Sequence, residues 1–145
     1  MWSARSQWIA SILLASACSA PATPAPTPSP VLIGALNPAV TQASIRATVC
    51  RSGWTATIRP PASYTNTLKR RQLPKGADLK AYEEDHLIPL ALGGAPRDPA
   101  NLRPIPLDRA KRDDVVETRL HRQLCAGTIT LAQAQLAISQ VKAGE

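Results

Sequence analysis

A proline-rich stretch near the N-terminus sets the largest limit on how this chain can fold. Residues 19–30 read SAPATPAPTPSP. Prolines at this density remove backbone N–H donors and favour an extended chain, and the stretch has almost no apolar surface to bury. It therefore predicts a semi-rigid tether. The folded part is expected in residues 31–145, a length typical of one domain.

The residues before this tether have the pattern of an export signal. Arg5 supplies positive charge, residues 8–17 are apolar, and Ala15-Ser16-Ala17 fits an A-x-A cleavage site. The apolar segment is shorter than the ~20 residues that cross a bilayer. We therefore expect residues 1–17 to be a signal peptide and the protein to be periplasmic, secreted or membrane-anchored. A buried N-terminal helix is the alternative, although the segment has no polar face.

Cys18 directly follows these small residues and opens the linker of residues 18–30. Its setting resembles the lipobox of bacterial lipoproteins, in which the cysteine is acylated. A lipobox usually has Leu three positions before the Cys, whereas Ala15 stands there and Leu14 lies one place too early. Membrane anchorage through a lipid on Cys18 and simple secretion therefore both remain open.

Two further cysteines could stabilise the folded part. The chain has no Phe and few other aromatic residues, so its core must be thin and built from Leu, Ile, Val and Ala. Small exported domains of this kind often need a covalent cross-link such as a disulfide. We expect a disulfide between Cys50 and Cys125, worth about 4.5 kcal/mol in the chain-entropy model. A zinc site is less favoured because the Cys and His residues lack close ligand spacing, and a catalytic cysteine has no supporting motif.

Charge is unevenly distributed along the folded part. Residues 31–80 hold eight Lys and Arg residues and one acid, whereas residues 81–145 hold eight basic and nine acidic residues. A basic surface attracts polyanions such as nucleic acid or anionic lipid. Ordinary charge for solubility is the alternative explanation.

The sequence predicts four helices in the folded part. Asn37-Pro38 is expected to open a helix that buries Ile45 and Val49 and ends near Cys50. Residues 63–73 are a second, strongly basic helix candidate. A third helix is expected from Asp108, as its cap, to about Leu124. Thr130 and Gln133 form a capping-box pattern that opens a last helix.

Two short strands are expected between these helices. They are the apolar runs at residues 87–88 and 102–105, separated by a Gly93-Gly94 turn and a loop. The order of helices, then strand, loop, strand and helix, then a final helix indicates an α+β fold.

The strand–loop–strand–helix unit also carries the chemistry. It reads YEEDHLIPLALGGAPRDPANLRPIPLDRAKRDDVVE over residues 82–117. Asp85-His86, two apolar residues, Pro89, Gly93-Gly94 and Asn101-Leu102 follow one another in the order found in HNH endonucleases. This part of the chain resembles that family, which implies a ββα-metal HNH-type core with flanking helices and a nuclease-like domain over residues 31–145.

The resemblance implies a role for each matched residue. His86 would be the general base that activates water, because the pKa of an imidazole lies near neutral pH. Asp85 would give an oxygen ligand to a divalent metal ion, Mg²⁺ first, with Mn²⁺ or Zn²⁺ as alternatives. Asn101 would be structural and tie the loop, and Gly93-Gly94 would allow a tight turn. Each residue also has a plain structural explanation, and only their joint order favours chemistry.

One position departs from the family pattern. HNH units usually end with a His or Asn on the helix that completes the metal site, and this sequence has Ala110 and Lys111 at that distance. Asp114 lies one turn further on the same face, so we expect it to be the second metal ligand. Asp113 and Asp114 could instead complement the helix dipole. His121 is expected to be structural or exposed.

Three functions follow from these features. The favoured one is an exported, metal-dependent endonuclease that hydrolyses phosphodiester bonds in DNA or RNA. The second is a noncatalytic envelope protein that binds nucleic acid or another polyanion on a degenerate nuclease fold. The third is a structural envelope lipoprotein. Metal-dependent cleavage separates the first from the others, and salt-sensitive binding without cleavage identifies the second.

Overall fold

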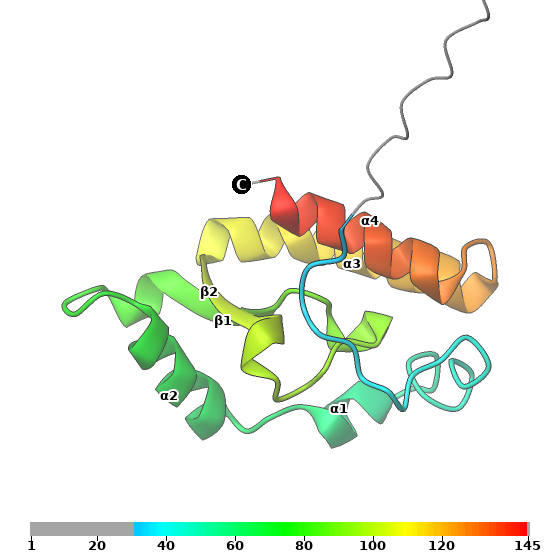
Figure 1. Cartoon of the computed structure of the whole chain (residues 1–145), viewed down its shortest axis with the longest axis horizontal. Helices are drawn as coiled ribbons and strands as arrows, with labels where there is room; N and C mark the ends of the chain where they lie inside the picture. Colours follow the sequence, from blue (N-terminus) through cyan, green and yellow to red (C-terminus); the bar gives the residue numbers. More distant parts are fainter. Residues whose placement is uncertain (1–30, 145) are drawn as a thin grey trace, which may run out of the picture.

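Helices pack around a small two-stranded sheet in residues 31–144, the part of the chain that the computed structural model describes (Figure 1). The longer elements in chain order are α1 (Trp54–Ile58), α2 (Ala62–Gln72), β1 (Tyr82–His86), β2 (Leu102–Pro106), α3 (Leu107–Ala126) and α4 (Leu131–Ala143). Single turns of 3-10 helix lie at Leu79–Ala81, Leu90–Leu92 and Pro99–Asn101. The α+β class predicted from the sequence is confirmed. The expected signal peptide and linker lie outside the described residues.

The sheet is antiparallel, and its register sets the position of the motif. Asp85 pairs with Arg103, and His86 pairs with Leu102. Figure 1 shows α3 running directly on from β2, α4 lying along α3, and α2 on the opposite side of the sheet. The motif residues at the end of β1 therefore lie between α2 and the α3–α4 pair.

The core lies where α3, α4 and the loop after β1 meet. Ile88, Leu92, Leu124 and Ile138 are completely buried there. No helix within residues 31–144 is long and apolar enough to cross a membrane.

Three of the expected elements are found close to their predicted positions. The basic helix is α2, which begins one residue before the predicted range, and the second strand is β2. The last helix is α4, with the predicted capping box formed by Thr130 and Gln133. The third helix is also present, but its predicted cap is wrong. Pro106 precedes α3, and Asp108 lies within the first turn, where it pairs with Arg112 at 2.9 Å.

The helix predicted from Asn37 to Cys50 is absent, and this prediction is wrong. The segment is a series of turns that still buries Ile45 and Val49. Its polar side chains compete for backbone groups: the Ser44 Oγ accepts from the Thr41 N–H at 2.8 Å and donates to the Ala39 carbonyl at 2.9 Å. Such local hydrogen bonds favour turns over a regular helix.

The first strand was also misplaced. β1 is the charged run Tyr82–His86, and residues 87–88 follow it in the loop. The backbone of Ile88 has no strand partner because the side chain of Asn101 takes that place: the Ile88 N–H donates to Asn101 Oδ1 at 2.8 Å, and Asn101 Nδ2 donates to the Ile88 carbonyl at 3.0 Å. An apolar run therefore packs as a loop in the core.

Candidate active site

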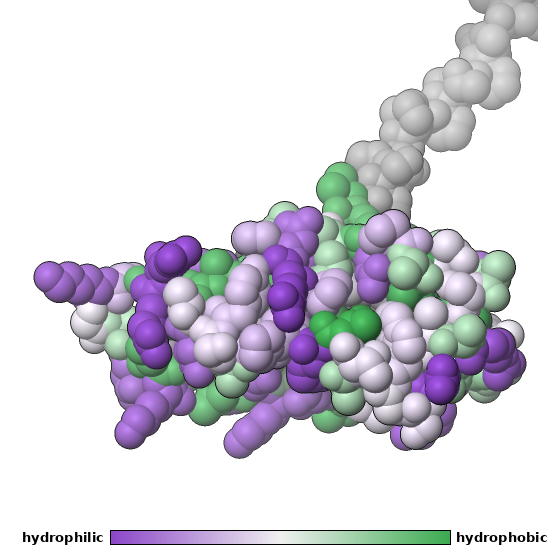
Figure 2. All heavy atoms as spheres, turned by 90° about the horizontal axis from the view of Figure 1, so that it is seen from below, coloured by the Kyte–Doolittle hydropathy of each residue, from purple (hydrophilic) through white to green (hydrophobic). Residues whose placement is uncertain are grey.

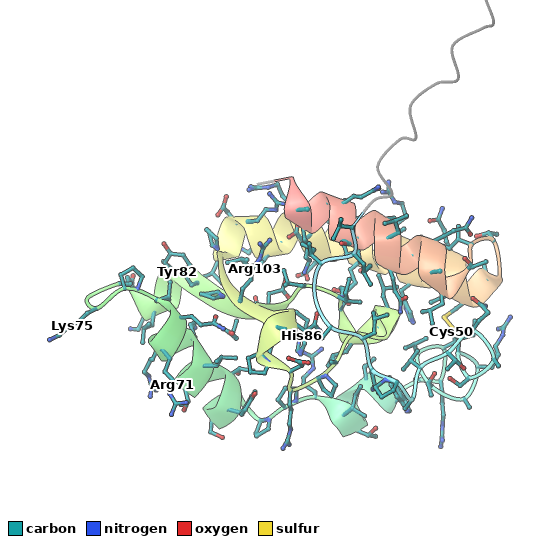
Figure 3. All side chains as sticks on the ribbon, viewed as in Figure 1. Cys50, Arg71, Lys75, Tyr82, His86 and Arg103 are labelled. Carbon is teal, nitrogen blue, oxygen red and sulfur yellow. A yellow bond between two sulfur atoms is a disulfide. The ribbon has the colours of Figure 1, made fainter. Side chains whose placement is uncertain are left out.

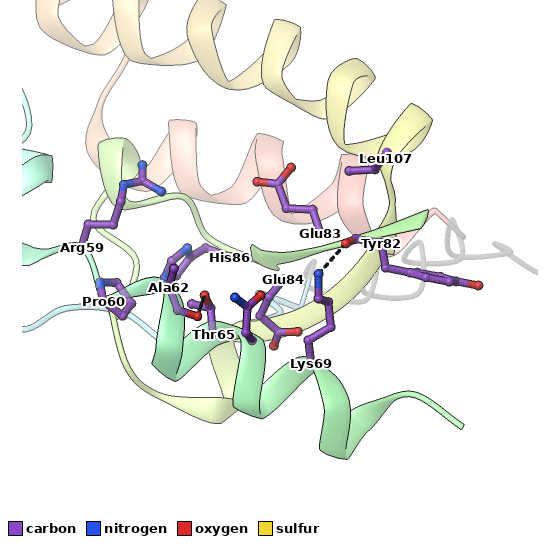
Figure 4. A pocket seen from close by; sticks show the side chains of 11 residues that line it. Arg59, Pro60, Ala62, Thr65, Lys69, Tyr82, Glu83, Glu84, His86 and Leu107 are labelled. Atoms are coloured by element: carbon purple, nitrogen blue, oxygen red, sulfur yellow. Dashed lines mark hydrogen bonds between the residues drawn. The ribbon is translucent and has the colours of Figure 1, made fainter. Parts of the chain in front are cut away.

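Strand β1 distributes its side chains between two neighbouring helices. Successive side chains of a strand point to opposite faces. Figure 4 shows Glu83 directed toward α3 and Glu84 directed toward α2. His86 ends the strand and lines a cavity on each side. Of the predicted catalytic pair, His86 thus lies at the junction of the two cavities, and Asp85 lines only the one beside α3.

His86 is buried, and its ring is held by a backbone carbonyl. Only 7% of the residue is exposed, and its Nε2 lies 3.1 Å from the carbonyl oxygen of Pro96. A carbonyl only accepts hydrogen bonds, so Nε2 carries the proton and Nδ1 keeps its lone pair in the neutral ring. Burial lowers the pKa of His86. The imidazole is therefore neutral near pH 7, the form that a general base requires.

Asn101 supports the loop that carries this carbonyl. Its side chain is completely buried. Besides its two bonds to Ile88, its Nδ2 donates to the carbonyl of Ala95 at 2.9 Å. Ala95 directly precedes Pro96, so the amide fixes the backbone that orients the histidine. The contacts of Asn101 are all structural.

The Gly93-Gly94 turn belongs to the same loop. Gly93 has a φ of 82°, which favours glycine. A Cβ on Gly94 would lie 1.7 Å from the Ile88 carbonyl oxygen, so only glycine fits there. The pair allows the loop to close onto Asn101.

Asp85 is paired with a lysine that the sequence analysis did not single out. The Nζ of Lys142, from α4, donates to Asp85 Oδ2 and also to the backbone carbonyl of His86, the latter at 2.7 Å. Lys142 is only 2% exposed. One lysine from the last helix therefore fixes both residues of the motif, and it neutralises part of the negative charge of Asp85.

An acidic cavity of about 390 Å³ lies between β1 and α3. Its ionisable lining consists of His86 and of Arg59, Glu83, Asp85, Asp114 and Glu117. The predicted ligand Asp114 thus shares a cavity with Asp85. It lies two turns into α3 rather than in the first turn, because α3 begins at Leu107.

Glu117 also lines this cavity, and the sequence analysis missed it. Its pKa is raised to about 7, mainly by burial and in part by the charges of Asp85 and Asp114, whereas Lys142 and Arg59 lower it. Glu117 lies three residues after Asp114, so both belong to one face of α3. That spacing is the signal that could have revealed it.

Asp113 lies elsewhere, although it is adjacent in sequence to Asp114. It is 3% exposed, and it accepts a hydrogen bond from Arg109 Nε at 2.8 Å. Arg109 also donates to the carbonyl of Val141 on α4 at 2.7 Å. Asp113 therefore helps to join α3 to α4, whereas Asp114 is exposed at the cavity.

The acidic cavity suits a hard divalent cation in its chemistry. Carboxylate oxygens are the ligands that Mg²⁺ and Mn²⁺ prefer. The raised pKa of Glu117 reflects burial beside other acids, and a bound cation would relieve this repulsion. Among the described residues, however, these acids do not form a cluster with ligand atoms within 4.8 Å of one another. Asp85, Asp114 and Glu117 would have to draw together to hold an ion.

Cys50, His121 and Cys125 do form a compact group of potential metal ligands, with ligand atoms within 4.8 Å of one another. The predicted disulfide is present, however, and joins Cys50 to Cys125 over a Cα–Cα distance of 5.5 Å (Figure 3). While it is intact, neither sulfur is a thiolate. The prediction that the Cys and His residues lack the close spacing of metal ligands is wrong, because His121 and Cys125 lie one helical turn apart on α3.

A second cavity, of about 340 Å³, lies between β1 and α2 (Figure 4). It is lined by Arg59, Thr65, Asn66, Lys69, Glu84 and His86, among others. Burial raises the pKa of Glu84 to about 7. Lys69 is engaged, because its Nζ donates to the carbonyls of Leu79 and Tyr82 at 3.0 and 2.8 Å.

The surface beyond this cavity is strongly hydrophilic. Arg70 and Arg71 are exposed on α2, and Lys75 is exposed in the turn that follows it. Figure 2 shows hydrophilic side chains projecting from the surface at the α2 end of the molecule. The basic residues predicted from the sequence are therefore available to a polyanion on the α2 side of His86.

Comparison of the chain with protein families, with curated proteins and with solved structures finds no match.

Proposed function

We propose that the protein is a metal-dependent phosphodiesterase of the HNH endonuclease type that hydrolyses DNA or RNA. The observation that carries this proposal is the placement of His86. A neutral imidazole, oriented through Nε2 by the carbonyl of Pro96, shares one cavity with the carboxylates of Asp85, Asp114 and Glu117. A general base next to oxygen ligands is the combination that phosphodiester hydrolysis requires.

In this proposal each residue of the site has its own role. His86 Nδ1 takes a proton from a water molecule, whose oxygen forms a bond to the phosphorus while the bond between the phosphorus and the leaving oxygen breaks. Asp85, Asp114 and Glu117 would hold a divalent cation, which would neutralise charge at the phosphate and at the leaving oxygen. Lys142 orients Asp85 by holding one of its oxygens, and the other oxygen is left for the cation. Asn101 keeps the loop and the Pro96 carbonyl in place.

A second function, noncatalytic binding of nucleic acid, is favoured by one specific observation. Lys142 already pairs with Asp85, and an ammonium group at this carboxylate reduces the need for a metal ion. Together with the exposed basic residues of α2, such a site would bind a polyanion without cutting it.

One experiment separates the two functions. The purified protein is incubated with plasmid DNA and with RNA in Mg²⁺, in Mn²⁺ or in EDTA. The nuclease proposal expects cleavage that EDTA abolishes. Binding that weakens steeply with salt, without cleavage in any metal, would support the binder instead.

We also propose that the protein is exported. The Cys50–Cys125 disulfide supports this, because disulfides persist in oxidising compartments. Intact-mass measurement of the protein from a bacterial host tests the proposal. Cleavage before Cys18 is expected, with added acyl mass if the cysteine is lipidated. A chain that still begins at Met1 would contradict export, and an unmodified Cys18 would contradict lipidation alone.

A further inference from the structure

Arg59 stands where the two cavities meet. It lines both the acidic cavity beside α3 and the cavity beside α2, as His86 does. Figure 4 shows its side chain on the same side of the site as the imidazole. A group bound beside His86 in either cavity therefore shares that cavity with this guanidinium.

The backbone at Arg59 is held in place by the residues after it. Arg59 has φ −60° and ψ 129°, the extended conformation that a residue before proline adopts. Pro60 is buried, and Pro61 precedes the first turn of α2. The Arg-Pro-Pro sequence thus gives the side chain a fixed origin between α1 and α2.

The guanidinium makes no hydrogen bond or close ion pair within residues 31–144, although its charge lowers the pKa of Glu83 and of Glu117. The other basic groups at the site are engaged: Lys142 is bound to Asp85 and the His86 carbonyl, and Lys69 is bound to two backbone carbonyls. Arg59 is exposed. Within residues 31–144, it is the unpaired cation that lines both cavities.

A phosphodiester needs such a group here. The acidic cavity alone repels a phosphate anion, and a cation held by the carboxylates offsets only part of this repulsion. A guanidinium presents donors in a planar fork that matches two phosphate oxygens. An engaged lysine cannot supply this geometry.

We propose that Arg59 is a catalytic residue that binds the nonbridging oxygens of the scissile phosphate and holds its phosphorus beside His86. This inference rests on the proposed function, because it assigns the substrate contact of the same site. Its charge also stabilises the additional negative charge that develops on these oxygens as water attacks.

The test compares Arg59→Ala and Arg59→Lys with Arg51→Ala, in which an exposed arginine that lines neither cavity is lost. Cleavage of a short labelled oligonucleotide in Mn²⁺ gives kcat and KM. Removing one donor group at a developing oxyanion typically costs about 10²–10³-fold in kcat. We expect that loss for Arg59→Ala, partial recovery for Arg59→Lys, and a change within about twofold for Arg51→Ala. Circular dichroism checks that each variant is folded.

Two results would overturn the inference. The first is an Arg59→Ala protein that cleaves as fast as the parent. The second is an equal loss of activity in Arg51→Ala, which would reveal a general charge effect.

Failure of the proposed function is distinguishable from failure of this inference. If the parent cleaves nothing, the nuclease proposal fails, and binding of the same oligonucleotide at low salt decides the role of Arg59. Weaker binding in Arg59→Ala than in Arg51→Ala supports a phosphate contact, and equal binding rejects it.

Discussion

The two histidines of the described chain have almost the same local contact and very different surroundings. His86 Nε2 lies 3.1 Å from the carbonyl of Pro96, and His121 Nε2 lies 2.8 Å from the carbonyl of Val49. Beside His86 are a cavity and the carboxylates of α3. Beside His121 are the sulfur of Cys125, at 3.4 Å, and a closed disulfide.

The comparison shows that an oriented imidazole is not by itself a mark of catalysis. Two parts of α3 provide side chains that could ligate a metal ion. Near its middle, Asp114 and Glu117 line a cavity; near its C-terminus, the sulfur of Cys125 is bonded to that of Cys50. The proposed chemistry therefore belongs to the region of His86, and we expect a structural role for His121.

The largest expected effect separates these histidines directly. His86→Ala should lower metal-dependent cleavage by about 10²–10⁴-fold, the usual contribution of a general base. His121→Ala should change activity by less than about threefold, because it contacts neither cavity. The measurement is kcat on plasmid or oligonucleotide substrate. A His86→Ala protein as active as the parent would reject the HNH-type mechanism.

The next prediction tests the structural character of the other region. A Cys50→Ser, Cys125→Ser double variant should lose about 2–4.5 kcal/mol in free energy of unfolding, because the disulfide closes a long loop. Urea unfolding at 25 °C measures this loss. Below the transition the variant should keep most of its activity. An equal fall in kcat under folded conditions would show that the two regions are coupled.

A smaller effect is expected among the acids of α3. Asp114→Asn and Glu117→Gln should each weaken Mn²⁺ binding by about 10-fold or more, whereas Asp113→Asn should leave it nearly unchanged. Asp113→Asn should instead lower stability, because Asp113 is buried against Arg109. Isothermal titration with Mn²⁺ and thermal unfolding provide the two readouts. Similar, small changes in affinity for Asp113→Asn and Asp114→Asn would identify both as surface acids without a metal role.

The smallest expected effect is the pH dependence of Mn²⁺ affinity. In metal-free protein, the pKa of Glu117 is raised from 4.5 to about 7, mainly by burial. A cation binds the ionised form, so Mn²⁺ affinity should fall as pH decreases below about 7, by at most about tenfold per pH unit.

The free energy of unfolding measured in EDTA should decrease as pH rises, whereas Mn²⁺ affinity should increase. The folded protein holds the Glu117 proton more tightly than the unfolded chain does, so stability falls as pH rises from 4.5 to about 7. Glu117→Gln should remove this loss and be about 1–3 kcal/mol more stable at pH 8. A parent protein whose Mn²⁺ affinity is flat between pH 5.5 and pH 8 would contradict the assignment of Glu117.

Several features of the fold could be predicted because local sequence determines them. The capping box at Thr130 begins α4, and the basic helix and the second strand lie within one residue of their predicted ranges. The failures have physical causes. Ser44 captures backbone groups where a helix was expected, and Asn101 replaces the strand partner of Ile88.

The candidate site likewise contains residues that local sequence predicts and residues that it does not. The motif placed Asp85, His86 and Asn101 in one unit, and helical spacing placed Asp114 near them. Lys142 lies 57 residues from Asp85 in sequence, and Arg59 precedes His86 by a helix, a turn and a strand. No local pattern connects such residues, because only the packing of α2 and α4 around the sheet brings them to the site.

The contact of Lys142 with Asp85 also determines when the site can exist. Until α4 has formed and packed, Asp85 lacks its ion pair with Lys142, and the His86 carbonyl lacks the hydrogen bond from the same ammonium group. A nascent chain therefore contains Asp85 and His86 before Lys142 is available to them. For a protein that would cut nucleic acid, this delays activity until synthesis has passed residue 142 and the chain has folded. The contacts that Lys142 makes with Asp85 and His86 are therefore among the last that the chain can form.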